Sequence, residues 1–540
     1  MTFDLILRGG QVADGSGAPA RPADVAVKGD RIAAVGDLAA ARATREIQAA
    51  GLMVAPGFID AHAHSDAYLL IEPDAPSKLT QGITTEVNGQ CGGSVAPRLG
   101  EARLSSDWAS QHYPRFSPAG GVEANPDPGP TWGTVAEYRR LFDAVQPAIN
   151  TIQFIGHNTL RAGVMGYAPR PAAAADLREM IRRLEQALEE GGWGLSTGLL
   201  YPPGKYAAGE EVAVLVRAAA LRGGMYATHM RSEGDELLES VGEVLRLARD
   251  TGIRVQISHL KTSGRDNWPK IEALLEMLRR ARDAGVALHG DRYPYTASGT
   301  DLDVVLPEWA AAGGRDAILA NLRSPAARRR MEEELDANPR DWSAVMIGGG
   351  WSAEVRRFSG RTVADAAAEL GLSPGSVVCR FIERDETRTG AFFFVMCEAN
   401  LRHLYREPWI MPGSDASLRA PWGPLGLDHP HPRAYGTMPR FVRIVTGREE
   451  GVPAVCGIEE AVRRMTSLPA CAFGIRDRGT LIPGAFADVT VFDPETFRDT
   501  ATFAVPHQFA AGVRQVIVNG AVAFDNGRFT GERRGRFLSR

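Results

Sequence analysis

The sequence lacks the marks of a membrane or secreted protein. It contains no run of eighteen apolar residues, and its start shows no basic region followed by a long apolar stretch. Its five cysteines are an odd number and have no framework spacing, which is typical of reduced thiols. We therefore expect neither export nor membrane insertion, and we predict a cytoplasmic location.

An excess of basic charge is also missing. The 61 Lys and Arg residues are outnumbered by 65 Asp and Glu residues, so the formal net charge is -4. Nucleic-acid binding proteins usually show the opposite balance. With 44% hydrophobic and 23% charged residues, the chain has the composition of an ordinary globular protein. We expect small-molecule partners and no nucleic acid, while the oligomeric state stays unknown.

What is present is a change of pattern along the 540 residues. Both ends contain short segments of alternating apolar and polar residues, and Asn519-Gly520 is a strong hairpin signal. The middle alternates strand and helix patterns in units of about thirty residues, which predicts a parallel sheet covered by helices, with room for insertions around a barrel. We predict an α/β fold of three segments: 1–56, the first part of a small β-sandwich domain; 57–477, a (β/α)8 TIM-like barrel with insertions near 98–130 and 303–390; and 478–540, the second part of the sandwich.

Two histidines stand out in "VAPGFIDAHAHSD", residues 54–66. His62 and His64 are two apart, so on a strand both side chains project to the same face. An isolated H-x-H pair is more often two polar residues at the start of a loop. Here an apolar run follows Pro56-Gly57 and ends in the pair, which places the histidines at the carboxyl end of a strand. Active sites of barrels lie at that end.

Four more residues with metal-binding side chains follow strand patterns: Cys91, His229, His259 and Asp415. Taken singly, a cysteine is usually a small buried hydrophobe, and a histidine is as often a core residue as a ligand. Thiolate and imidazole together suit zinc, and a catalytic zinc keeps one position open for water. Six such residues at strand ends therefore predict a metal-dependent hydrolase.

These motifs resemble a known family. "PGFIDAHAHSD" with the later His, His and Asp resembles the amidohydrolase superfamily. Its D-aminoacylase branch, the N-acyl-D-amino-acid deacylases, is similar in "NGQCGGSVAP", "STGLLYPPG", "THMRSEGD", "SHLKTSG", "YPYTASGT", "GSDAS" and "HPRAYGTMPR". The resemblance covers nearly the whole chain and is weakest at about 98–130 and 303–395.

The resemblance implies a zinc site. Cys91, His229 and His259 would hold one tight zinc, while His62, His64 and Asp415 would line a second position that is weaker or empty. Many superfamily members bridge two metals with a carboxylated lysine or a glutamate. Neither Lys205 nor Lys261 fits that position, so Cys91 is the expected bridging group.

The resemblance also implies catalytic and substrate-binding roles. Asp415 would accept a proton from the attacking water and return it to the leaving amine, and His64 or the metal would polarise the scissile carbonyl. Arg433 would bind the substrate's α-carboxylate. Tyr293, Tyr201 and Ser298 are the other candidate substrate contacts; Gly299 stands where relatives are expected to carry a second hydroxyl.

We therefore expect zinc-dependent hydrolysis of N-acyl-D-amino acids to a carboxylate and a free D-amino acid. One alternative is a cyclic amidase of the dihydropyrimidinase or hydantoinase kind, against which the cysteine motif argues. Another is a scaffold that has kept the barrel and lost activity, although such proteins typically lose ligands that are all present here.

Overall fold

The computed structural model describes residues 2–104, 106–117, 121–124, 131–449 and 451–540. The predicted insertion near 98–130 therefore falls partly outside the described residues, at 105, 118–120 and 125–130. Within the described part of the chain, no helix combines the length and apolarity needed to cross a membrane.

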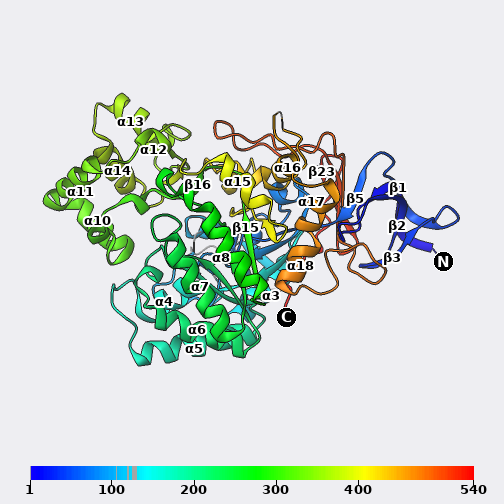
Figure 1. Cartoon of the computed structure of the whole chain (residues 1–540), viewed down its shortest axis with the longest axis horizontal. Helices are drawn as coiled ribbons and strands as arrows, with labels where there is room; N and C mark the ends of the chain where they lie inside the picture. Colours follow the sequence, from blue (N-terminus) through cyan, green and yellow to red (C-terminus); the bar gives the residue numbers. More distant parts are fainter. Residues whose placement is uncertain (1, 105, 118–120, 125–130, 450) are drawn as a thin grey trace.

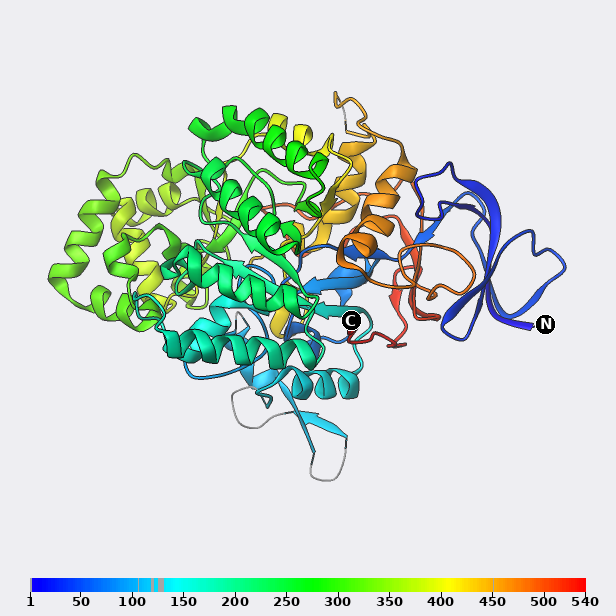
Figure 2. The same cartoon turned by 60° about the horizontal axis from the view of Figure 1, so that its bottom comes forward.

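A closed barrel of eight parallel strand positions forms the centre of the molecule (Figures 1 and 2). Each strand pairs with the next in parallel. The ring closes where Asp415 N donates to His62 O at 2.8 Å and where Ala63 bridges Ala416. The strands, in barrel order, are β6 (Phe58–Asp60), β7 (Ile83–Asn88), β10 (Asn150–Gln153) continued by β11 (Ile155–Gly156), β12 (Gly194–Gly198), β13 (Met225–His229), β14 (Arg254–Ile257), β15 (Leu288–Arg292) and β19 (Ile410–Pro412).

Amphipathic helices cover the barrel. In α7 (Leu237–Thr251), Leu237, Val241 and Val244 are buried at the three- to four-residue spacing of one helix face. The helix ends at Gly252, whose φ of +66° is a conformation that glycine adopts without strain. The other helices around the strands are α1 (Tyr68–Ile71), α2 (Pro76–Leu79), α3 (Val135–Val145), α4 (His157–Met165), α5 (Ala174–Glu189), α6 (Gly209–Leu221), α8 (Ile271–Asp283), α15 (Glu398–Tyr405), α16 (Arg433–Val445), α17 (Ile458–Met465) and α18 (Ser467–Phe473).

The two ends of the chain share one nine-stranded sheet. β5 (Met53–Pro56) pairs antiparallel with β20 (Val489–Phe492) and joins the two halves. The expected hairpin is confirmed: Asn519 and Gly520 both have positive φ between two paired strands, as a tight two-residue turn requires. The remaining strands are β1 (Thr2–Val12), β2 (Arg21–Lys28), β3 (Arg31–Gly36), β4 (Arg42–Gln48), β21 (Val513–Val518), β22 (Ala521–Asp525) and β23 (Arg528–Phe529).

An insertion between β15 and β19 carries its own hydrophobic core, drawn from residues between Leu302 and Phe393. Its lobe lies at the opposite end of the long axis from β1, β2 and β3 (Figure 1). The predicted class, a (β/α)8 barrel with a small β-domain, is confirmed, whereas the boundaries at residues 56 and 477 stay a prediction. The insertion contains β16 (Ser298–Asp301), β17 (Val345–Ile347), β18 (Gly390–Phe393), α9 (Glu308–Ala311), α10 (Gly314–Arg323), α11 (Pro325–Ala337), α12 (Ala353–Arg356), α13 (Val363–Leu370) and α14 (Pro374–Arg384).

Candidate metal centre

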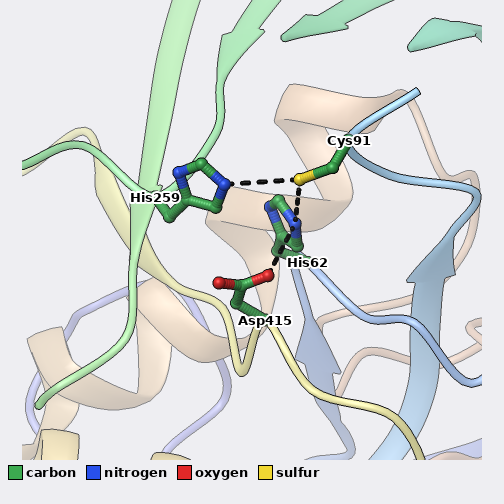
Figure 3. Close-up of side chains that lie close together, drawn as sticks. All are labelled: His62, Cys91, His259 and Asp415. Carbon is green, nitrogen blue, oxygen red and sulfur yellow. Dashed lines mark hydrogen bonds and ion pairs between the residues drawn. The ribbon is translucent and has the colours of Figure 1, made fainter. Parts of the chain in front are cut away.

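The carboxyl ends of four barrel strands bring four predicted ligands together (Figure 3). The Cys91 Sγ lies 3.4 Å from His62 Nε2 and 3.3 Å from His259 Nε2. Asp415 Oδ1 lies 3.4 Å from the same nitrogen of His62. One ligand atom of each of the four residues lies within 4.8 Å of the others. One ion could therefore contact all four.

His64 and His229 flank this group. The His64 Nε2 lies 3.0 Å from Asp415 Oδ1. The His229 ring lies 4.5 Å from the His259 ring, centroid to centroid. His229 is buried, and neither of its ring nitrogens has a hydrogen-bond partner in the described part of the chain. Because unpaired buried polar atoms are costly, this imidazole is suited to a metal ion.

The backbone is unusual at three of the four grouped residues. Cys91, His259 and Asp415 have φ values of +52°, +35° and +49°. Residues other than glycine rarely adopt this left-handed backbone conformation, and such strain persists only where the surrounding structure enforces it. Hydrogen bonds do so here: His259 N donates to Asp291 Oδ1 at 3.0 Å, and Asp415 N donates to His62 O. The strand ends are thus fixed so that these side chains converge.

The charges of the site favour a cation. Burial alone raises the pKa of the Cys91 thiol, but His62 and His259 outweigh it and hold that pKa well below its usual range. Burial likewise raises the pKa of Asp415, but Arg433 and His259 hold it well below the usual value for a carboxyl. A thiolate and a carboxylate therefore face imidazoles, and a divalent cation could take the place of the protons on those rings.

Two carboxylates that the sequence analysis missed orient the histidines. Asp291 lies 3.3 Å from the Nδ1 of His62, and Glu233 lies 2.8 Å from the Nδ1 of His259. A carboxylate on Nδ1 leaves Nε2 free to face a metal. Asp291 belongs to β15, and Glu233 follows His229 by four residues; their position near strand ends was the available signal. Lys261 contacts Glu233 and the Nδ1 of His259 at 2.8 Å, on the ring edge away from Cys91.

The predicted substrate residues lie beside this centre. Arg433 begins α16, and its Nη1 donates to Asp415 Oδ2 at 2.7 Å while its Nη2 donates to Gly299 O at 3.2 Å. Its guanidinium carbon lies 4.6 Å from the centroid of the Tyr293 ring. The Tyr201 ring lies 4.9 Å from that of His229. Ser298 begins β16, next to Gly299.

Two hydrogen-bond donors near the centre have no partner among the described residues. The Arg433 Nε and the Tyr293 hydroxyl are both buried without a hydrogen bond in the described part of the chain. They belong to two side chains that contact one another. Together they suit an anion such as a carboxylate, because a guanidinium and a phenol can both donate to its oxygens.

The chain is similar in sequence and structure to known deacylases of N-acyl-D-amino acids. D-aminoacylase and N-acyl-D-glutamate deacylase, both from Alcaligenes xylosoxydans xylosoxydans, are each 36% identical to this chain; the alignments cover 100% of it and 98% and 97% of those proteins. A crystal structure of N-acyl-D-glutamate deacylase from Bordetella bronchiseptica, complexed with zinc and a phosphonate inhibitor, matches with a TM-score of 0.82 and 34% identity over the full length of both chains.

Solved structures of lower sequence identity show a likeness of fold alone. A dihydropyrimidinase from Brevibacillus agri aligns with a TM-score of 0.56 at 16% identity, covering 99% of this chain and 98% of that one.

The amidohydrolase family matches residues 45–524. The chain therefore belongs to the amidohydrolase family and, within it, to the D-aminoacylase branch.

Proposed function

We propose that this protein is a zinc-dependent deacylase that hydrolyses N-acyl-D-amino acids to a carboxylate and a free D-amino acid. The observation that carries the proposal is a thiolate-centred donor set, Cys91 with His62, His259 and Asp415, directly beside Arg433. The first part suits metal-assisted hydrolysis of an amide, and the second suits a substrate with a free carboxylate. We propose a small-molecule substrate of this class as the partner of the site.

Zinc fits the residues at the centre. Cysteine sulfur and histidine nitrogen are its usual ligands. Buried His229, whose ring nitrogens have no hydrogen-bond partner among the described residues, offers a further ligand atom. We assign a tight position to Cys91, His229 and His259, and a second, weaker position to His62, His64 and Asp415. When bound, zinc would supply a Lewis acid that acidifies water and polarises the scissile carbonyl.

The chain's own residues supply the proton transfers. Asp415 faces the donor set and, as a carboxylate, can accept a proton from the attacking water and pass it to the leaving amide nitrogen. Burial lowers the pKa of His64, but its interactions with Asp415 and Cys91 together outweigh this and raise the pKa to about 9. When the second metal position is empty, His64 can donate a hydrogen bond to the oxygen that becomes negative.

The α-carboxylate would be held by Arg433 and Tyr293. Their unpaired Nε and hydroxyl can donate to it while Arg433 Nη1 keeps its contact with Asp415. This argues against a cyclic amidase, whose ring substrates offer no free carboxylate to those donors. A non-catalytic scaffold is disfavoured because every residue of the donor set is present and grouped.

Selectivity for the D-enantiomer is the first expected result. With the acyl carbonyl and the α-carboxylate both fixed, an L-substrate must direct its side chain to the position that only hydrogen occupies in the D-substrate. We expect N-acetyl-D-amino acids to be hydrolysed faster than their L-enantiomers by roughly a hundredfold or more in kcat/KM. Matched D and L pairs assayed with the zinc-loaded protein measure this. Equal rates, or preferential opening of a hydantoin ring, would refute the assignment.

Replacement of Arg433 should weaken binding of the substrate's α-carboxylate. In Arg433→Ala we expect kcat/KM for the D-substrate to fall by roughly a hundredfold or more, because a charge-assisted contact is removed and the substrate is misplaced. Arg433→Lys, which keeps the charge without the planar fork, should restore part of the loss. The carboxamide analogue of the substrate should be hydrolysed slowly by both the wild type and the variant. If Arg433→Ala slows the carboxamide as much as the acid, Arg433 does not bind the carboxylate.

A further inference from the structure

A buried lysine lies behind the segment that carries Asp415. Lys78, on α2, is fully buried, as are its two partners Asp60 and Glu86. The Lys78 Nζ lies 3.1 Å from Asp60 Oδ2 and 2.7 Å from Glu86 Oε1. Buried ions are costly, and apolar side chains can often replace them without loss of stability. Stability alone therefore gives a weak reason for this arrangement.

Lys78 holds the residues on both sides of Asp415. Its Nζ donates to Ser414 Oγ at 3.2 Å and to Ala416 O at 3.1 Å. Asp60 also binds Ser414: its Oδ1 accepts a hydrogen bond from Ser414 N at 2.8 Å, and its Oδ2 accepts one from Ser414 Oγ at 2.6 Å. Asp415, with its left-handed backbone conformation, thus lies between two residues that are held by hydrogen bonds, Ser414 and Ala416.

The same cluster reaches the two histidines that follow β6. Asp60 Oδ1 accepts from His62 N at 3.3 Å. Ala416 O, which Lys78 contacts, accepts from His64 N at 3.2 Å. The backbones of His62, His64 and Asp415 are therefore fixed relative to one another through the buried Lys78–Asp60 ion pair.

Glu86 extends the cluster further along the segment. Its Oε1 accepts from Ser65 Oγ at 2.9 Å, and Ser65 Oγ accepts from Leu418 N at 2.9 Å. The loop after β19 is thus attached to β7 as well as to β6. Asp415 lies within a stretch that is anchored at residues 414, 416 and 418.

We propose that Lys78, with Asp60 and Glu86, is a positioning residue for catalysis: it holds the 414–418 segment so that the Asp415 carboxylate faces His62 and His64. Without Lys78 the strained Asp415 backbone is free to relax, and the carboxylate turns away from the reacting water. The inference rests on the proposed role of Asp415, and it concerns residues outside the donor set.

The test compares Lys78→Met with the same substitution at another buried cation, Arg478. Methionine keeps the length of the side chain and removes its charge. Arg478 is also buried, and it pairs with Asp488 and Asn519 beside the nine-stranded sheet. Arg478→Met therefore removes a buried charge whose two partners lie outside the metal centre. The measurements are the thermal unfolding midpoint, tight zinc content, and kcat and KM for an N-acetyl-D-amino acid.

We expect kcat of Lys78→Met to fall roughly 10- to 100-fold, with KM changed far less and tight zinc retained, because the reacting group is misplaced. Arg478→Met should lower the unfolding midpoint and leave kcat unchanged. If Lys78→Met does not fold, Lys78→Met/Asp60→Asn balances the charge and should show the same loss of kcat. A normal kcat in the folded Lys78 variants would overturn the proposal.

A second measurement separates this proposal from the proposed function. In a crystal structure of the Lys78 variant we expect Asp415 to leave the left-handed region and its carboxylate to move away from His64. An unchanged Asp415 conformation would overturn the positioning role, even if the enzyme proves to act on another substrate. Absence of turnover in the wild-type protein would refute the proposed function alone.

Discussion

Replacement of Asp415 by asparagine should lower kcat by about a hundred- to ten-thousandfold while the tight zinc is retained. Asparagine keeps the shape of the side chain but cannot accept a proton, and a lost general acid-base group typically has an effect of this size. Tight zinc should survive because we assign it to Cys91, His229 and His259. Metal analysis and steady-state kinetics on the same preparation measure the two quantities.

Asp428 provides a matched control for this experiment. Its side chain is 13% exposed and pairs with Arg419 at 2.8 Å, whereas that of Asp415 is 12% exposed and pairs with Arg433 at 2.7 Å. Asp428→Asn should leave kcat close to that of the wild type. A near-wild-type kcat in Asp415→Asn, or an equal loss in both variants, would contradict the catalytic role of Asp415.

The second large effect is expected from Cys91→Ala. The purified wild-type protein should contain one to two equivalents of zinc, about one of them tight. Removal of the thiolate takes away the donor that contacts both His62 and His259, so tight zinc should fall well below one equivalent and turnover should fall with it. Elemental analysis after gel filtration measures the metal.

Cys379 is the control for the cysteine. Cys379 is buried in the core of the insertion, whereas Cys91 is partly exposed, and burial raises the pKa of the Cys379 thiol to about 12. Cys379→Ala should lower stability and leave the zinc content unchanged. If Cys91→Ala keeps its full zinc and activity, Cys91 is only a core residue and the bridging assignment is wrong.

The grouping of the donor set could be predicted from sequence because barrel strands all end at one mouth. His62, Cys91, His259 and Asp415 are far apart in the chain, but each follows a recognisable strand. The hairpin at Asn519-Gly520 was equally accessible, since its two residues favour positive φ. In these cases a local pattern determines the structure.

The supporting contacts could not be predicted in this way. Asp291, Glu233 and Lys78 acquire their partners only when distant strands and helices pack together, and no spacing in the sequence indicates which carboxylate will face which histidine. The pairing of Arg433 with Asp415 is of the same kind. The fold of the insertion depends on its own core, for which the sequence offered no repeating strand-helix pattern.

Zinc dependence and D-selectivity can be tested together by titrating the metal-free protein with zinc and measuring hydrolysis of an N-acetyl-D-amino acid and its L-enantiomer. We expect no turnover without metal. We expect activity on the D-substrate to rise with zinc and to reach most of its maximum at about one equivalent, with the L-substrate slower by roughly a hundredfold or more. Full activity in the metal-free protein, or zinc-dependent activity that is equal for both enantiomers, would contradict the proposed function.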